Sequence, residues 1–283
     1  MKINNLSGRI ILLAVLTALA LIMLLMTDKP ADAEEEQHVL LDELIVSGQC
    51  VGCNLEMASM RHIKVRGLNL SGANLREADM KDADMPETNF HRADLRRASL
   101  EKSYMPDSNF DQAKLRQVDF EKSNLEGAKF TGVDLRDADL KSADIKGADF
   151  SNSDLRHASF NRSNAETALF RDSNMANVVF DRVNANEADF SGSNMVQSDL
   201  SRTIAVAAIF KDTNLSKVNF TSADLTQANL DGANVAGALF RRARLAGVDF
   251  SKAIGADDAR FISSCRDELT VLPEGVEMDM CDD

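Results

Sequence analysis

The 283-residue chain has no tryptophan, a single tyrosine and an aromatic content of only 5%. Small-molecule pockets are usually lined by apolar and aromatic side chains, so this composition argues against a large aromatic binding pocket. The chain also has only one long uncharged apolar run, and no later segment offers it partner helices for a buried core. The apolar content of 44% is nevertheless sufficient for a sizeable core.

The formal net charge of −13 is distributed unevenly along the chain. Residues 27–54 carry −6 and residues 251–283 carry another −6, whereas residues 55–250 carry only −3. The acidity therefore belongs mainly to the two ends. The long middle of the chain is nearly balanced in charge.

Residues 1–33 have the features of a signal peptide or a membrane anchor. Lys2 and Arg9 precede seventeen uncharged residues at 10–26, a length between that of a signal-peptide core and a short membrane span. An A-x-A cleavage motif ends at Ala33. Basic residues before the apolar run and acidic residues after it predict export of the remaining chain. We expect a protein of the periplasm or bacterial cell envelope, cleaved after Ala33 or anchored in the membrane through residues 10–26.

Most of the chain repeats with a period of five residues. From Leu70 to Phe250 every fifth residue is apolar, which gives 37 centres without an insertion or deletion. The residue two before each centre is Ala, Ser, Thr or Val except at Leu68, and the residue directly before it is Asp or Asn in 26 cases. Neither a helix nor a strand places such a repeat on one face. A chain that turns a corner every five residues buries the centre and the residue two before it, and Asp and Asn are expected at the corners.

A longer period of twenty residues sets the number of sides. Thirteen of the fourteen phenylalanines occupy centres. Eight of them are spaced by multiples of twenty: Phe90, Phe110, Phe130, Phe150, Phe170, Phe190, Phe210 and Phe250. Twenty residues per coil correspond to four sides, so the sequence predicts an all-β solenoid of square cross-section with about ten coils.

The segments ADLRR (93–97), ADLKS (138–142), ANLRE (73–77) and ANLDG (228–232) match the motif A(D/N)LXX. By this motif the chain resembles the pentapeptide-repeat family over residues 50–252. The resemblance implies a right-handed quadrilateral β-helix. The exposed ends of a solenoid need caps. We expect an amphipathic helical cap at 34–49, ended by Gly48, and a C-terminal cap or tail at 253–283 that leaves the repeat.

The four cysteines all lie beside the repeat, and we consider them as disulfide candidates: Cys50, Cys53, Cys265 and Cys281. Cys50 and Cys53 form a CxxC pair at inward positions, and a CxxC pair opening the first coil also fits the family resemblance. A structural role is favoured, and thiol redox chemistry is the alternative. No second ligand pair has the spacing of a zinc site. In an exported protein we expect local pairing, 50–53 and 265–281.

No arrangement of residues predicts catalysis. The inward positions between residues 70 and 250 include no titratable side chain, so the core should be a packed column without a substrate cavity. The four histidines are scattered, and no Ser/His/Asp set or phosphate-binding glycine loop is present. We therefore predict no enzymatic activity, no metal and no cofactor, and expect function on the outward faces.

One outward face carries an arginine at the same position of five consecutive coils. We call this set the arginine ladder: Arg76, Arg96, Arg116, Arg136 and Arg156. It is either a solvated row neutralised by nearby acids or a docking site for an anionic polymer or acidic protein. The neighbouring face adds Lys102, Lys122, Arg162, Arg182, Arg202 and Arg242, and the opposite face is acidic. Ile204, Val206 and Ile209 are a candidate apolar contact for a partner or a homodimer.

The sequence thus predicts a non-enzymatic, exported, rigid binding scaffold of the cell envelope, whose partner is a protein or an anionic envelope polymer and not a nucleic acid. One alternative comes from the family resemblance, which implies imitation of DNA by an acidic rod that inhibits a type II topoisomerase. The export segment and the nearly neutral coils disfavour that alternative. A second alternative is a thiol redox protein acting through Cys50 and Cys53.

Overall fold

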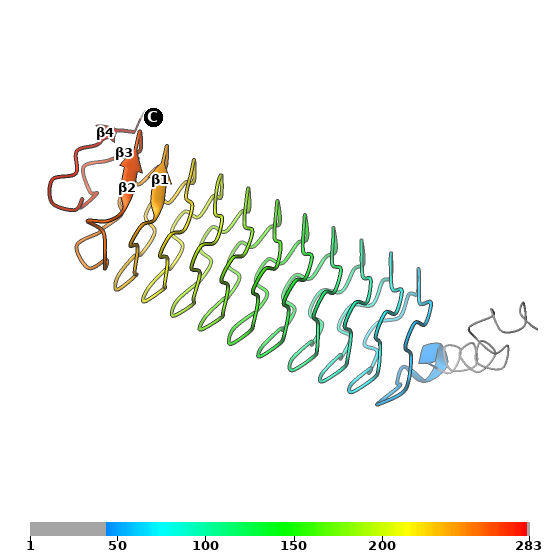
Figure 1. Ribbon diagram of the computed structural model, residues 1–283. Coiled ribbons are helices and arrows are strands. Elements are labelled where there is room, and N and C mark those ends of the chain that lie inside the picture. Colours follow the sequence, from blue (N-terminus) through cyan, green and yellow to red (C-terminus); the bar gives the residue numbers. More distant parts are fainter. Residues whose placement is uncertain (1–43, 282–283) are drawn as a thin grey trace, which may run out of the picture. The chain divides into compact units, whose positions relative to one another are not determined.

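The computed structural model describes residues 44–281. The expected signal or anchor segment at 1–33, and residues 34–43 of the expected helical cap, lie outside the described residues. The described residues form a β-helical solenoid of stacked coils, each joined to the next through backbone pairing (Figure 1). Within this part of the chain, no helix has the length and apolar character that crossing a membrane requires.

Parallel backbone bridges join residues twenty positions apart. They run from Gln49↔Asn69 to Asn234↔Ile254, always at the residue directly before a centre. The N–H of Asn74 donates to the carbonyl of Cys53 at 2.9 Å, and the N–H of Leu75 donates forward to the carbonyl of Asp94 at 2.8 Å. The same two bonds recur along the repeat, which confirms the predicted period of twenty residues.

The corners are β-turns that begin at each centre. The N–H of Ala78, for example, donates to the carbonyl of Leu75 at 3.1 Å. The second turn residue is left-handed throughout: every residue numbered with a final 2 or 7 from Gly52 to Gly247 has a φ between +53° and +72°, as in a type II turn. The Asp and Asn residues expected at the corners lie instead at the bridges. Their side chains accept a bond from the N–H two residues on, as Asn89 Oδ1 does from His91 at 3.0 Å.

The core consists of the residues that the five-residue period predicts. Every centre from Leu70 to Phe250, and every residue two before a centre, is at most 3% exposed. Between Phe90 and Phe210 the phenylalanine rings of successive coils stack with centroids 4.6–5.2 Å apart. A second row packs edge-on against the first, as Phe120 does against Phe130 at 5.9 Å. The interior is therefore filled by aromatic, aliphatic and small side chains.

At some corners a buried hydroxyl group replaces the missing hydrogen bond between the backbone groups of the turn. Ser153 Oγ donates to the carbonyl of Phe130 at 2.6 Å and accepts from the N–H of Val133 at 3.2 Å. Ser173 Oγ donates to Phe150 in the same way at 2.7 Å. Because an unpaired buried peptide group is costly, the hydroxyls of Ser153 and Ser173 stabilise the two corners at which the turn bond is missing.

At the N-terminal end of the described chain, residues 44–47 are helical. Gly48, with φ +69°, ends the helix as predicted, and its N–H donates to the carbonyl of Leu44 at 2.9 Å. Leu44 is buried, whereas Ile45 and Val46 are exposed. Leu44 is thus the residue of this turn that contributes to the core.

At the C-terminal end the backbone pairing continues past residue 252, but after Ile254 the paired residues are 21 or 22 positions apart instead of twenty. Strand β1 (Leu239–Arg241) pairs in parallel with β2 (Arg260–Ile262), 21 residues further on. The later bridges are Arg244↔Cys265 and Asp249↔Val271. Phe261 stacks on Phe240 with centroids 5.1 Å apart. The segment expected to leave the repeat therefore forms a further coil, in which extra residues are accommodated at the corners.

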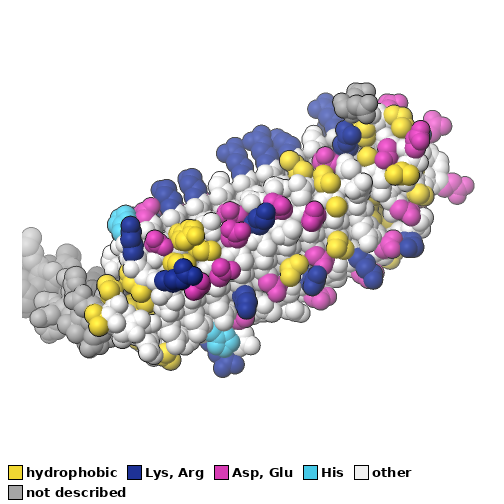
Figure 2. Space-filling view, turned by 180° about the vertical axis from the view of Figure 1, so that it is seen from behind, with side chains coloured by type: hydrophobic (Ala, Val, Ile, Leu, Met, Phe, Trp, Pro, Cys, Tyr) yellow, Lys and Arg dark blue, Asp and Glu magenta, His cyan; other side chains and the backbone are white. Residues whose placement is uncertain are grey.

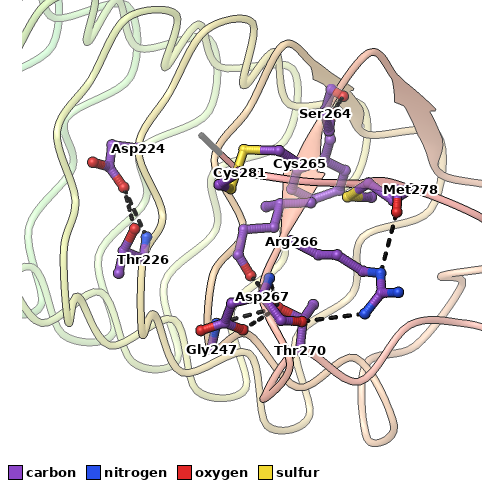
Figure 3. The surroundings of a disulfide bond; sticks show 12 residues. Asp224, Thr226, Gly247, Ser264, Cys265, Arg266, Asp267, Thr270, Met278 and Cys281 are labelled. Carbon is purple, nitrogen blue, oxygen red and sulfur yellow. Dashed lines mark hydrogen bonds between the residues drawn. A yellow bond between two sulfur atoms is a disulfide. The ribbon is translucent and has the colours of Figure 1, made fainter. Parts of the chain in front are cut away.

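The last residues are fastened to this coil. Strand β3 (Cys265–Arg266) pairs in parallel with β4 (Asp279–Met280). A disulfide joins Cys265 to Cys281, and Arg266 Nε donates to the carbonyl of Met278 at 3.2 Å (Figure 3). The Asp267 carboxylate accepts from the N–H of Gly247 at 2.8 Å, which ties the tail to the preceding coil.

Substitution of Gly255 tests how closely this extra coil packs against the preceding one. Its φ is +70°, and a Cβ there would lie 2.7 Å from Ala236 Cβ and 3.0 Å from Ala236 Cα. Gly132 has a similar φ of +67° with nothing within 4 Å. We expect Gly132→Ala to cost about 1 kcal/mol through backbone conformation, and Gly255→Ala to cost clearly more through the clash. Denaturant titration and limited proteolysis of the C-terminal coil measure both; equal losses would contradict the packing described.

Candidate binding surface

The interior offers no place for chemistry in the described chain. The inward positions between residues 70 and 250 carry only apolar and hydroxyl side chains, packed to nearly complete burial. Within residues 44–281, no cluster of three or more His, Cys, Asp or Glu side chains could hold a metal ion. The candidate functional groups of this part of the chain therefore lie on its outward sides.

The structure brings the five residues of the arginine ladder into one row, and pairs them with carboxylates. Arg136 Nε and Nη2 donate to the two oxygens of Asp134 at 2.7 and 2.6 Å. Arg156 binds Asp154 in the same bidentate way at 2.8 and 2.7 Å, and Arg96 binds Asp94 likewise. In each pair the aspartate precedes the arginine by two residues, so both side chains leave the same side of the coil.

The remaining ladder residues have longer contacts. Arg76 Nη1 lies 3.9 Å from Glu56 Oε1, and Arg116 Nη2 lies 3.4 Å from Asp137 Oδ2. The hydrogen bond from Arg136 holds the pKa of the Asp134 carboxyl below its usual range, and this carboxylate in turn raises the pKa of the Arg136 guanidinium. Arg96, Arg136 and Arg156 are thus closely paired with acids, whereas Arg76 and Arg116 have longer contacts with theirs.

A second basic row lies one corner further along each coil than the arginine ladder. We call it the basic corner: Lys102, Lys122, Arg162, Arg182, Arg202 and Arg242. All six are second turn residues, with φ between +53° and +61°, and all are exposed. Figure 2 shows basic side chains projecting in a row along one edge of the solenoid.

The two halves of the basic corner differ in their ion pairs. Lys102 Nζ lies 2.7 Å from Glu101, and Lys122 pairs with Glu121. Hydrogen bonds from Lys102 and Lys81 lower the pKa of Glu101 to about 2. In the C-terminal half, Arg182 and Arg202 share the single carboxylate of Asp181, at 4.0 and 2.7 Å. Among residues 44–281, Arg162 and Arg242 have no ion pair within 4.0 Å.

The side opposite the arginine ladder is acidic. We call it the acidic side: Asp84, Glu87, Asp107, Glu126, Asp144, Glu166 and Glu187. Part of its charge is balanced internally, by Arg66 with Glu87 and by Lys146 with Glu166 at 3.1 Å. A shallow groove of about 600 Å³ crosses its N-terminal half between Tyr104, Pro86, Pro106, Gly127 and their neighbours.

The candidate apolar contact is divided by the fold. Ile204, 47% exposed, and half-buried Val206 flank the buried centre Ala205 on one side of the coil. Ile209 precedes the next centre and so lies on the following side of the coil. The three residues therefore lie on two adjacent sides of the coil, and a corner stands between Ile209 and the other two.

The four cysteines form two disulfides, Cys50–Cys53 and Cys265–Cys281, which is the local pairing expected from the sequence. All four residues are half-buried. The first disulfide lies in the first coil and the second fastens β4 to the last one. Both therefore lie at the places where the repeat begins and ends.

Comparison with known families gives matches along the whole repeat. The family model "Pentapeptide repeat region" matches residues 80–150. The model "Pentapeptide repeats (8 copies)" matches residues 53–92, 134–172, 168–202, 186–221 and 219–254. The chain belongs to the pentapeptide-repeat family. No curated protein sequence matches it.

Several solved structures are similar. HetL from the cyanobacterium Nostoc sp. strain PCC 7120, involved in heterocyst differentiation regulation, is 21% identical, with 84% of this chain and 97% of HetL covered and a TM-score of 0.38. Trypsin-treated QnrB1, a plasmid-mediated fluoroquinolone resistance protein, is 16% identical over 68% and 90% of the chains, with a TM-score of 0.46. A pentapeptide-repeat protein of the Arabidopsis thaliana thylakoid lumen is 26% identical over 45% and 68%, with a TM-score of 0.18.

The pairing within the ladder is testable by carboxyl titration. We expect Arg136→Gln to raise the pKa of Asp134 toward its ordinary range, because the hydrogen bond that lowers it is removed. A lowered acid pKa stabilises the fold above the unfolded-state pKa and loses this contribution as the pH falls. The variant should therefore lose less stability than the wild type on acidification. NMR titration of the side-chain carboxyls measures the shift, with Asp189, which bonds to Arg171 and Ser191, as the control that should not change.

Proposed function

We propose that this pentapeptide-repeat protein is a rigid, non-enzymatic binding scaffold that acts in the cell envelope. The observation that carries the proposal is the contrast between a packed interior without titratable groups and outward sides on which charge is sorted into rows. A solid interior leaves no cavity for a substrate. Rows with a constant spacing of about 4.8 Å present a repeating surface, which suits a long or repeating partner. We further propose that the β-helix is right-handed, with about ten coils.

Two features support the envelope location. The sequence of residues 1–33 has the basic, apolar and cleavage-site regions of an export segment. The Cys50–Cys53 and Cys265–Cys281 disulfides are bonds that persist in oxidising compartments. The scaffold would then be either tethered through residues 10–26 or released after Ala33.

Inhibition of a type II topoisomerase by imitation of DNA is the second candidate function. The acidic side favours it, since Asp107 and Glu126 have no ion pair among the described residues. The arginine ladder and the basic corner oppose it, because a DNA-like surface needs negative charge over its whole length. The cell compartment distinguishes the two candidates.

Cell fractionation with sequencing of the mature N-terminus tests the envelope proposal. We expect the full chain, expressed with its own N-terminus, in the membrane or the periplasm. A start at Glu34 would identify a signal peptide, and an uncleaved membrane-bound chain would identify an anchor. A chain that remains soluble in the cytosol would contradict the envelope location, and inhibition of DNA supercoiling by that protein would establish the second candidate.

The redox alternative has its own assay. We expect no reduction of insulin disulfides above background, because Cys50 and Cys53 lie at inward positions of the first coil and are joined to each other by a disulfide. The Cys53→Ser variant is the matched control. Activity in the wild type that this variant abolishes would identify a thiol oxidoreductase and contradict the purely structural role.

A further inference from the structure

The C-terminal half of the basic corner has more positive charge than its surroundings balance. Arg162, Arg182, Arg202 and Arg242 are all exposed, and Asp181 is the single carboxylate paired with them among residues 44–281. Arg241 of β1 is exposed beside Arg242 and has no ion pair in the same part of the chain. Stacked like charges repel one another. This row therefore has an unsatisfied preference for an anion.

The repeat explains why this row differs from the arginine ladder. A ladder arginine is a first turn residue, and the bridge residue two positions earlier can be an aspartate that shares its side of the coil. A corner arginine is a second turn residue, and the residue two positions before it is a buried centre such as Phe160 or Phe180. No carboxylate can stand there. At this corner the acid comes instead from a first turn residue, as with Glu101, Glu121 and Asp181. The first turn residues beside Arg162, Arg202 and Arg242 are Asn161, Ser201 and Arg241, so these three arginines have no acid directly before them.

We propose that this half of the basic corner binds an extended acidic polysaccharide through the guanidinium groups of Arg162, Arg182 and Arg202. The inference rests on the proposed envelope function and names the surface and the class of partner. Arginine presents a planar fork that binds a carboxylate through two hydrogen bonds. Three such forks occur on three consecutive coils.

The spacing of the row favours a polysaccharide over a polypeptide. Successive corner arginines are one coil apart, about 4.8 Å, so the row is a regular line of guanidinium groups that an unbranched polyanion can follow from coil to coil. An extended polypeptide places side chains of the same face about 6.8 Å apart, out of register with the coils. The first turn positions of the same side hold the uncharged residues Asn161, Ser201 and Thr221, so they add no competing acid to the row.

The row also sets the length of the ligand. Ser222 interrupts it between Arg202 and Arg242, so the continuous part covers three coils. Arg241 and Arg242 form a separate basic point two coils further on. An oligosaccharide that reaches both parts should bind more tightly than one that covers three coils, because the second contact is then intramolecular.

The experiment measures binding of polygalacturonate, a linear polymer of one acidic sugar, to the purified full chain in mild detergent. We expect binding that weakens as salt is added. The triple variant Arg162→Gln, Arg182→Gln, Arg202→Gln should bind at least about tenfold more weakly. The matched control, Arg96→Gln, Arg136→Gln, Arg156→Gln, removes the same charge from the arginine ladder and should change the affinity less than about threefold.

A gain-of-binding variant covers the case in which the triple variant does not fold. Asp181→Asn removes the one internal competitor for Arg182 and Arg202, so it should strengthen polygalacturonate binding severalfold. Loss of binding in this variant, equal losses in both triple variants, or no binding by the wild type would each overturn the proposal.

The choice of polymer tests the partner class. Equal or tighter binding of polyglutamate or single-stranded DNA would overturn the assignment to a polysaccharide. An exported protein without polygalacturonate binding would refute this inference and leave the envelope function standing. A cytosolic protein that binds the polymer through the corner would refute the envelope function instead, so the two failures are distinguishable.

Discussion

The structure depends on one constraint: every coil must pair its backbone with the coils on either side, twenty residues away. A single residue inserted within a side would move a buried centre to the surface, as a one-residue slip does in any sheet, whereas the last coil accommodates its extra residues at the corners. The unbroken period from Leu70 to Phe250 satisfies this constraint. Because the pairing fixes which coil positions lie above one another, it also determines that like residues form rows. The outward rows of charge are consequences of the same bonds that hold the core together.

The period predicts the core completely, because inward position follows from residue number alone. It does not predict the role of Asp and Asn, which depends on the direction of a short side chain. At Asn89 that side chain supports the following corner from the bridge position. The solenoid also continues beyond residue 252, where the five-residue pattern in the sequence ends. Between Ile254 and Val271 the extra residues destroy the numerical register, although the backbone bonds and the Phe240–Phe261 stack continue.

The candidate surface could be predicted only in part. The sequence places Arg136 and Asp134 two residues apart, but it does not decide whether the guanidinium turns toward that aspartate or toward solvent. The structure shows the bidentate pair, and the unbroken ladder loses much of its attraction for an outside anion. The corner row has less regular sequence, with lysines, arginines and two serines at Ser142 and Ser222. Each ladder arginine has an ion pair, whereas Arg162 and Arg242 of the corner have none among residues 44–281.

The two rows of arginine on this solenoid therefore differ in how much of their charge is balanced by nearby acids. In the ladder, the acid is supplied by the coil itself, so the row contributes to the repeat and is largely balanced. In the corner, an acid can stand at the first turn position, but beside Arg162, Arg202 and Arg242 this position holds Asn161, Ser201 and Arg241. Mutual repulsion among Arg162, Arg182 and Arg202 is then relieved only in part, by Asp181. A bound anion would relieve the repulsion that remains.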